Sequence, residues 1–217
     1  MADNLAAALQ LMLVTDDDLV AGRDLVALAR AAEQGGVTSV QLRLKRASPR
    51  ELVEAARALI AALRAPVLVN DRPDVAIAAG AAGVHLGPDD LPVPLVRRIA
   101  PAGFIIGASA GTELEASAAA GADYWGIGPW RTTLTKADAG AALGPEGFAR
   151  IVGLADGRPC IAVGGVLPKD IPAVRRAGGV GVAVVRGILG GADVEAAAAA
   201  YANPGKSGSA GVPEGPP

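Results

Sequence analysis

Short apolar runs alternate with alanine-rich stretches of helical spacing along most of this chain. The runs are rich in aliphatic and β-branched residues and have the length of a strand: Leu11 to Thr15, Ser39 to Lys45, Pro66 to Asp71, Gly83 to Leu86, Ile105 to Ser109, Tyr124 to Trp130, Pro159 to Gly165 and Gly181 to Val185. Strands that alternate in this way with helices favour βα units around a parallel sheet.

Eight βα units within about 200 residues predict a closed (β/α)8 barrel, the TIM barrel, as a single α/β domain over residues 1–202. An open, doubly wound sheet is the alternative, but that fold more often carries a glycine-rich fingerprint after its first strand. Here the first strand runs into Thr15, Asp16, Asp17 and Asp18. Residues 203–217 are rich in Gly and Pro and have no apolar period, so we expect a disordered tail there.

Capping residues mark the boundaries of the expected helices. Ser48, followed by Pro49 and by Glu51, is typical of a helix N-terminus, and Thr112 can cap the helix after the fifth strand. Glycines near the ends of the helical stretches predict where the helices stop: Gly35, Gly36, Gly103, Gly121, Gly178 and Gly179.

The composition agrees with one soluble α/β domain. The chain has 217 residues, 51% hydrophobic and 3% aromatic, so it can bury one large aliphatic core. A formal net charge of -2 gives no basic surface for nucleic acid or an anionic membrane. The single cysteine, Cys160, lies in an apolar run, so we expect a buried strand residue and not a nucleophile. No signal segment or membrane-spanning run is recognised, which favours a cytoplasmic protein, and a homo-oligomer is left open.

In a barrel of this kind the active site lies at the carboxyl ends of the strands, where most of the unusual polar residues of this chain occur. The period of two in the second strand places Gln41, Arg43 and Lys45 on one face, which would be costly inside a barrel unless an anion compensates it. Asp71 and Asp90 follow the third and fourth strands. They predict a site for Mg2+, which takes oxygen ligands from carboxylates and substrate phosphates.

Each of these features has a simpler interpretation. A solvated edge strand would explain the polar face of the second strand, but only in an open sheet. Asp71 could belong to a turn that caps the helix beginning near Pro73. Asp90 could be an N-cap, and Asp89 is an equally plausible ligand by its position. The metal interpretation is favoured because both acids follow adjacent strands beside a predicted row of cations.

Three further strand exits carry groups suited to phosphate. The sixth strand runs into a connection about twice the usual length, which predicts a lid; a plain polar loop is the alternative. Its hydroxyls and ammonium can grip a phosphate: Thr133, Thr135 and Lys136. The seventh and eighth exits lie where many barrels bind phosphate on backbone N–H groups: Gly164, Gly165, Val185 and Arg186. The sequence therefore indicates chemistry on a phosphorylated or pyrophosphorylated small molecule.

The lone histidine, His85, lies inside the fourth strand. A histidine with its hydrogen bonds satisfied in the core or at the rim is favoured over a catalytic base. With one histidine in the chain, a Ser-His-Asp triad would have to use it, and a histidine-rich metal site is excluded.

Together these residues resemble the thiamine phosphate synthase family over roughly Leu11 to Ile188. No single motif is decisive, but their ordered set is specific: Gln41 to Lys45, Asn70-Asp71-Arg72, Gly83 to Gly87 with Asp90, Ile106 to Ser109, Thr133 to Lys136, Gly164-Gly165 and Gly181 to Val185. The resemblance implies a TIM barrel that joins 4-amino-2-methyl-5-hydroxymethylpyrimidine diphosphate to a thiazole phosphate, whose carboxylated form is also admitted. The products would be thiamine phosphate and pyrophosphate, which makes the protein a transferase of a pyrimidinylmethyl group.

The resemblance also implies roles for individual residues. The pyrimidine diphosphate would be held by Gln41, Leu42, Arg43, Leu44, Lys45, Asn70, Ser109 and Lys136. The thiazole phosphate would be held by Thr133, Leu134, Thr135, Gly165, Val185 and Arg186. Asp71 and Asp90 would hold one Mg2+ ion per site. The family's reaction is dissociative, so Arg43, Lys45 and Lys136 would stabilise charge on the departing pyrophosphate, and Ser109 is counted with them as catalytic.

The chain departs from the family pattern at several positions. Leu44 stands where a glutamate is usual, and alternation turns its side chain toward the helices, so we expect an effect on packing and not on chemistry. Thr132, Arg186 and Gly111 replace a usual proline, serine and histidine. A thiazole tautomerase paralogue is the nearest rival, but Asp71, Asp90 and Lys136 are retained, and no histidine at 110 or 111 can act as acid or base. A non-catalytic sensor of a phosphorylated ligand on the same barrel is a rival of another class.

Overall fold

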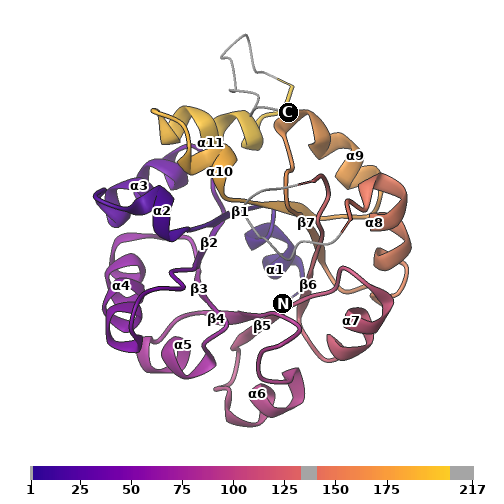
Figure 1. Cartoon of the computed structure of the whole chain (residues 1–217), viewed down its shortest axis with the longest axis horizontal. Coiled ribbons are helices and arrows are strands. Elements are labelled where there is room, and N and C mark those ends of the chain that lie inside the picture. The colour runs from indigo at the N-terminus through magenta and orange to yellow at the C-terminus, as the bar shows by residue number, and fades with distance from the viewer. Residues whose placement is uncertain (1, 133–140, 206–217) are drawn as a thin grey trace.

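Eight parallel strands form a closed barrel in the computed structural model, which describes residues 2–132 and 141–205, with side chains from residue 4 onward. Each strand pairs with its neighbours in the sequence, and β8 closes the ring on β1 (Figure 1). The strands are β1 (Leu11–Val14), β2 (Ser39–Leu42), β3 (Val67–Asn70), β4 (Gly83–Leu86), β5 (Ile105–Ser109), β6 (Tyr124–Ile127), β7 (Cys160–Val163) and β8 (Gly181–Val184). The predicted TIM barrel is confirmed.

Helices surround the barrel and connect its strands (Figure 1). They are α2 (Asp17–Val20), α3 (Leu25–Gln34), α4 (Pro49–Ala62), α5 (Pro73–Ala79), α6 (Val93–Ile99), α7 (Glu113–Ala118), α8 (Gly144–Val152), the 3-10 turn η1 (Pro168–Asp170), α9 (Ile171–Arg176), α10 (Arg186–Leu189) and α11 (Val194–Ala202). The predicted caps are confirmed, because Ser48 and Thr112 each form a capping box with the glutamate three residues later. Gly35 follows α3, and Gly103, Gly121 and Gly178 have positive φ, as stop signals require.

Two apolar cores lie on the two faces of the barrel. Residues such as Leu13, Leu42 and Trp125 pack outward in the large core shared with the helices. Their neighbours along each strand point inward, and a smaller inner core contains Met12, Val14, Leu68, Tyr124, Ile161 and Ala183. This alternation follows from the period of two in a strand and fixes which polar residues face the barrel axis.

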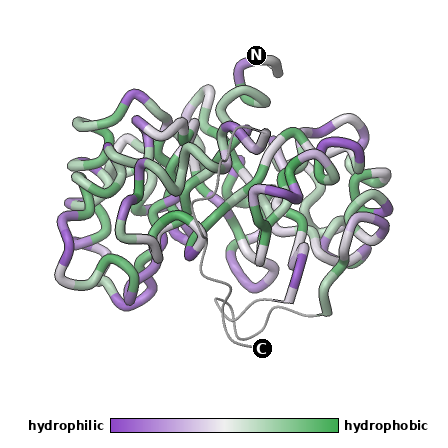
Figure 2. Tube along the Cα trace, turned by 90° about the horizontal axis from the view of Figure 1, so that it is seen from above, coloured by the Kyte–Doolittle hydropathy of each residue, from purple (hydrophilic) through white to green (hydrophobic). Residues whose placement is uncertain are grey.

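A short helix, α1 (Ala2–Ala8), closes the end of the barrel where the strands begin (Figure 2). Leu5 of α1 and Leu9 just after it pack against the inner core, and Leu9 is only 1% exposed. The opposite end, formed by the carboxyl ends of the strands, is where this fold places its sites.

Three strands, β2, β6 and β7, end two or more residues earlier than the sequence predicts, each for a local reason. β2 ends at Leu42 because the N–H of the next residue, Arg43, donates to the Thr15 hydroxyl at 2.7 Å and not to a backbone carbonyl of β1. β6 stops before Pro129, which has no N–H to donate. β7 stops before Gly164, whose φ of 86° leaves the strand conformation.

No helix in residues 2–132 and 141–205 is long and apolar enough to cross a membrane. The predicted tail lies outside the described residues from residue 206 onward, so its disorder stays a prediction.

Candidate active site at the carboxyl ends of the strands

The register of the barrel brings four polar side chains to its inner face near the rim: Gln41, Asn70, His85 and Ser109. Gln41 pairs with Val14 of β1, and Asn70 pairs with His85 of β4. Ser109 ends β5, one strand beyond His85. Because strand residues of the same parity share a face, these side chains converge on the interior of the barrel.

Inside the barrel a chain of polar contacts joins residues of five strands: β1, β2, β4, β5 and β6. The His85 Nε2 atom lies 3.2 Å from the Ser109 Oγ atom, and its Nδ1 atom lies 3.0 Å from the Tyr124 hydroxyl. Gln41 contacts the same hydroxyl and donates to the Met12 sulfur at 3.5 Å. Burial raises the pKa of Tyr124 by more than the Gln41 contact lowers it, so the phenol stays protonated. His85 is therefore a core histidine with its ring nitrogens in contact, as predicted.

Two glycines leave space for the side chains of these polar contacts. A methyl group at Gly107 would collide with the ring of Tyr124 on the neighbouring strand. A methyl group at Gly126 would lie 3.0 Å from the His85 ring. The sequence analysis did not predict Tyr124 as a site residue. The signal for a large inward side chain was an aromatic residue in one expected strand, with a glycine in the same strand and another in the neighbouring strand.

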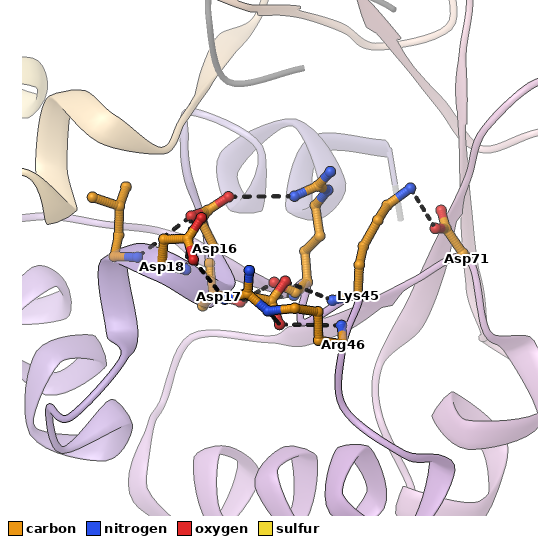
Figure 3. Close-up of polar contacts among 9 residues, drawn as sticks. Asp16, Asp17, Asp18, Lys45, Arg46 and Asp71 are labelled. Carbon is orange, nitrogen blue, oxygen red and sulfur yellow. Dashed lines mark hydrogen bonds and ion pairs between the residues drawn. The ribbon is translucent and has the colours of Figure 1, made fainter. Parts of the chain in front are cut away.

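The cations predicted on the second strand lie just beyond its end. The Arg43 Nη1 atom is 3.6 Å from the Asp16 carboxylate, and the Lys45 Nζ atom is 3.3 Å from the Asp71 carboxylate (Figure 3). The predicted inward row inside the strand is therefore wrong in part: only Gln41 belongs to the buried strand, while the Lys45 side chain is 54% exposed. The charges still gather at the rim, where an anionic substrate can reach them.

Leu42 and Leu44 present no side chain to this rim. Leu42 is fully buried in the outer core, and Leu44 packs against the same core, as alternation predicts. Any contact they make with a substrate would come from the backbone. A hollow of about 180 Å³ is nevertheless lined by both leucines together with Lys45, Asn70 and Asp71.

Asp71 and Asp90 face each other across the exits of β3 and β4. Burial, together with the nearby Asp71 carboxyl, raises the pKa of Asp90 to about 6. The Asp90 Oδ2 atom accepts the Gly87 N–H at 2.6 Å, whereas Asp89 is exposed. Neither acid caps a helix, because α5 and α6 begin after Arg72 and Pro92 without a side-chain cap.

The backbone of Asp71 is held in an uncommon conformation. Its φ is +62°, and its N–H donates to the His85 carbonyl at 2.8 Å. A non-glycine residue in the left-handed region costs free energy and persists where its surroundings fix it. The turn therefore presents the carboxylate toward Asp90 and Lys45.

This pair fits a hard divalent cation by its donor set. Two carboxylates and no nitrogen or sulfur ligand suit Mg2+, which completes its shell with water and substrate phosphates. The described residues contain no group of three or more His, Cys, Asp or Glu side chains that could hold a metal alone. Two carboxylates leave coordination positions that water and substrate phosphates would fill.

The exits of β7 and β8 form a second part of the rim. Gly164 and Gly165 have φ angles of 86° and 67°, a conformation in which successive N–H groups can face one anion. Val185 follows β8, and Arg186 begins α10 with an exposed side chain. The predicted lid residues Thr133, Leu134, Thr135 and Lys136 lie outside the described residues.

An ion pair that the sequence did not reveal ties the β6 and β7 exits together. Arg131 contacts the carboxylate of Asp170 twice, at 2.8 and 2.5 Å, and Asp170 also accepts the Leu167 N–H at 2.9 Å. The Arg131 N–H donates to the Gly164 carbonyl at 3.0 Å. Arg131 therefore lies directly against the glycine turn, where a methyl group on Gly165 would meet its Cβ at 2.8 Å.

The chain is similar in sequence to proteins of known family. A family model described as thiamine monophosphate synthase matches residues 11–188. The thiamine-phosphate synthase of Azorhizobium caulinodans is 47% identical over 198 residues, covering 88% of this chain and 92% of that protein. The thiamine-phosphate synthase of Methanoculleus marisnigri is 46% identical over 193 residues, covering 87% and 91%.

Solved structures agree with the sequence relatives. The structure of a thiamine phosphate pyrophosphorylase from Pyrococcus furiosus has a TM-score of 0.81 and 36% identity, covering 91% of this chain and 95% of that one. A 3-hexulose-6-phosphate synthase, with a TM-score of 0.66 and 20% identity over 89% of this chain and 98% of its own, shares the fold alone. The family match extends over all eight strands and the rim residues described above, and the chain therefore belongs to the thiamine monophosphate synthase family.

Proposed function

We propose that this chain is a transferase that joins 4-amino-2-methyl-5-hydroxymethylpyrimidine diphosphate to a thiazole phosphate, forming thiamine phosphate and pyrophosphate. The observation that carries the proposal is the contact between Lys45, Asp71 and Asp90 at the rim, beside Asn70. A cation beside two carboxylates is suited to a diphosphate that arrives with a divalent metal ion. The names of the relatives supply the product, thiamine phosphate, and the two substrates are those that the family resemblance implies.

The diphosphate is assigned to the exits of β2, β3 and β4. Arg43 and Lys45 neutralise its oxygens, Asn70 donates from its amide, and Asp71 and Asp90 would hold one Mg2+ ion. When bound, Mg2+ would supply positive charge that stabilises the leaving pyrophosphate. The Lys45 ammonium, now against Asp71, is placed to move onto the diphosphate with little rearrangement.

The pyrimidine ring is assigned to the barrel interior. Gln41 and Ser109 offer hydrogen bonds to ring nitrogens and the amino group, and the His85 contact holds the Ser109 hydroxyl in place. The thiazole phosphate is assigned to Gly165, Val185 and Arg186, with Thr133, Leu134, Thr135 and Lys136 as further ligands taken from the sequence. Thiazole and pyrimidine are thereby bound on separate parts of one rim.

A dissociative reaction suits the side chains present. Among the described residues, the cysteine thiol is no candidate nucleophile: Cys160 faces the outer core, and burial raises its pKa to about 12. The bond between the pyrimidine methylene carbon and the diphosphate oxygen breaks with its electron pair on the oxygen. The lone pair of the thiazole nitrogen then forms the new C–N bond. The enzyme's contribution is charge stabilisation by Arg43, Lys45 and Lys136 and orientation of the two substrates.

One assay tests the proposal. The purified protein is mixed with Mg2+, the pyrimidine diphosphate and the thiazole phosphate, and thiamine phosphate and pyrophosphate are measured. Equal amounts of both products are expected. Isomerisation of the thiazole without pyrophosphate would indicate the tautomerase, and binding without either product would indicate a sensor. A cytoplasmic location and the oligomeric state stay outside this assay and are measured by fractionation and by light scattering.

A further inference from the structure

The residues that follow β1 hold the residues that follow β2, and one carboxylate does so through the backbone. Asp17 is the first residue of α2, and its side chain is only 16% exposed. The Asp17 Oδ2 atom accepts the N–H of Lys45 at 2.9 Å, and its Oδ1 atom accepts the N–H of Arg46 at 3.2 Å (Figure 3). Both N–H groups lie beyond the end of β2. The carboxylate thus supplies hydrogen-bond acceptors to backbone N–H groups that lie beyond the end of the sheet.

The alternative role for Asp17, an ion pair with the Arg46 side chain, is weak. The Arg46 Nε atom is 3.9 Å away, and the Arg46 side chain is 65% exposed. Arg46 is held more closely by Asp18, whose carboxylate lies 2.6 Å from its Nη2 atom. Exposed ion pairs of this kind stabilise a protein by about 0 to 1 kcal/mol. The principal partners of Asp17 are therefore the two backbone donors.

Lys45 depends on this support because its own side chain is poorly fixed. The ammonium is 3.3 Å from Asp71, but the side chain is more than half exposed, so this contact alone orders it little. A charge-assisted pair of hydrogen bonds to consecutive N–H groups fixes the backbone from which the lysine extends. Fixing the starting point of a flexible side chain lowers the entropy that is lost when it binds a ligand.

We propose that Asp17 is a positioning residue for the diphosphate subsite, acting through the backbone of Lys45. It touches no substrate. Its carboxylate holds the β2 exit so that the Lys45 ammonium lies over the position of the leaving pyrophosphate. The inference rests on the proposed function, since it takes the diphosphate as the ligand of Lys45.

The test compares Asp17→Asn with Asp18→Asn in the full chain. The Asp17→Asn variant keeps the size of the side chain but replaces one acceptor oxygen with a donor, so one of the two backbone contacts is lost. Asp18→Asn makes the same chemical change one residue away, on a carboxylate that is 78% exposed and lies 2.6 Å from the Arg46 side chain. Binding of inorganic pyrophosphate in the presence of Mg2+ is measured by calorimetry, which requires no turnover.

The expected result is that Asp17→Asn weakens pyrophosphate binding and raises the KM of the pyrimidine diphosphate by about 10-fold, because small misplacements of a binding group are costly. The KM of the thiazole phosphate and all constants of Asp18→Asn stay unchanged. A Lys45→Ala background should abolish the effect of Asp17→Asn, since the two residues act through one contact. If Asp17 had a purely structural role, Asp17→Asn would lower the melting temperature without raising the KM of the pyrimidine diphosphate more than that of the thiazole phosphate.

Two outcomes overturn the proposal: pyrophosphate binding unchanged in Asp17→Asn, or an undiminished effect in the Lys45→Ala background. Failure of the wild-type chain to form thiamine phosphate, with the variant difference in pyrophosphate binding retained, would overturn the proposed function and leave the positioning role supported. The asparagine variant is used in place of Asp17→Ala because it keeps the size of the side chain and so its packing.

Discussion

Single residues at the rim differ in how they are held, and this difference predicts their sensitivity to substitution. Asp90 is fixed by the Gly87 N–H and lies against Asp71, whereas Asp89, its neighbour in the sequence, is exposed. The same chemical change at these adjacent positions therefore separates a role at the site from a general effect of charge.

We expect Asp90→Asn to lower kcat/KM at limiting Mg2+ by about 100-fold, comparable to removal of one group that stabilises transition-state charge. The loss of a charged oxygen ligand at constant size is the cause. Steady-state rates across a Mg2+ titration measure it, and excess Mg2+ should recover part of the loss. Asp89→Asn should behave as the wild type; an equal loss in both variants would remove Asp90 from the metal site.

Asp71→Asn should act in the same direction, with a second contribution. It removes a metal ligand and also the partner of Lys45 in the free enzyme. We expect a loss of at least about 100-fold in kcat/KM at limiting Mg2+, with an intact fold by circular dichroism. Full activity at limiting Mg2+ would exclude Asp71 as a ligand.

At the scale of elements, the exits of β6 and β7 are joined by an ion pair of side chains in addition to backbone hydrogen bonds. Burial raises the pKa of Asp170, but the hydrogen bonds from Arg131 and Leu167 outweigh it, and the net pKa lies below its ordinary value. The carboxylate is 8% exposed, while the corresponding Arg72–Asp74 pair on the surface has a carboxylate that is 61% exposed. We therefore expect the buried Arg131–Asp170 pair to stabilise the fold more than the exposed Arg72–Asp74 pair.

Asp170→Asn should lower the free energy of unfolding by about 2 to 3 kcal/mol at pH 7, because a buried charged acceptor is lost. For a protein of this size that corresponds to a melting temperature lower by about 4 to 12 °C. A group with a depressed folded pKa stabilises above its unfolded pKa and ceases to do so as pH falls through the folded value. The difference from wild type should therefore shrink below about pH 4.

Asp74→Asn is the matched control for this measurement. Its pair has similar geometry, with Arg72 Nε at 2.9 Å from Asp74, but it is exposed, so we expect a change of less than about 1 kcal/mol. A larger loss at Asp74 than at Asp170 would contradict the assignment of the Arg131 pair as the structural tie between the two exits.

At the scale of the whole molecule, stability and chemistry occupy opposite ends of the barrel. α1 and Leu9 seal the end where the strands begin, and the charged residues gather where the strands end. The closed barrel between them separates the two regions. Changes in the seal should therefore alter the free energy of unfolding without altering substrate affinity.

Leu9→Ala should cost about 2 to 5 kcal/mol of stability, since it leaves a cavity at a fully buried position. Below the melting transition, both KM values should match those of the wild type. Chemical denaturation and steady-state kinetics measure the two properties. Leu114→Ala, at a side chain that is 82% exposed, is the control and should change neither. A raised KM in Leu9→Ala would show that the two ends are coupled.

The sequence predicted the barrel and most of its rim, because both follow from short-range periodicity. The period of two identifies the buried face of each strand, and the fold places strand exits together, so Arg43, Lys45, Asp71 and Asp90 could be grouped in advance. Contacts between distant segments were not predictable. Neither the reach of Asp17 to the backbone of Lys45 nor the Arg131 pair has a periodic signal, since each depends on the path of a loop.

The contact between Gly107 and Tyr124 has a consequence for how this family can vary. A side chain at position 107 would occupy the volume of the tyrosine ring, so the two positions share one space across β5 and β6. We expect them to change together in related sequences, with a residue larger than glycine at 107 only where 124 is small. Tyr124→Ala should correspondingly make Gly107→Val tolerated, whereas Gly107→Val alone should prevent folding.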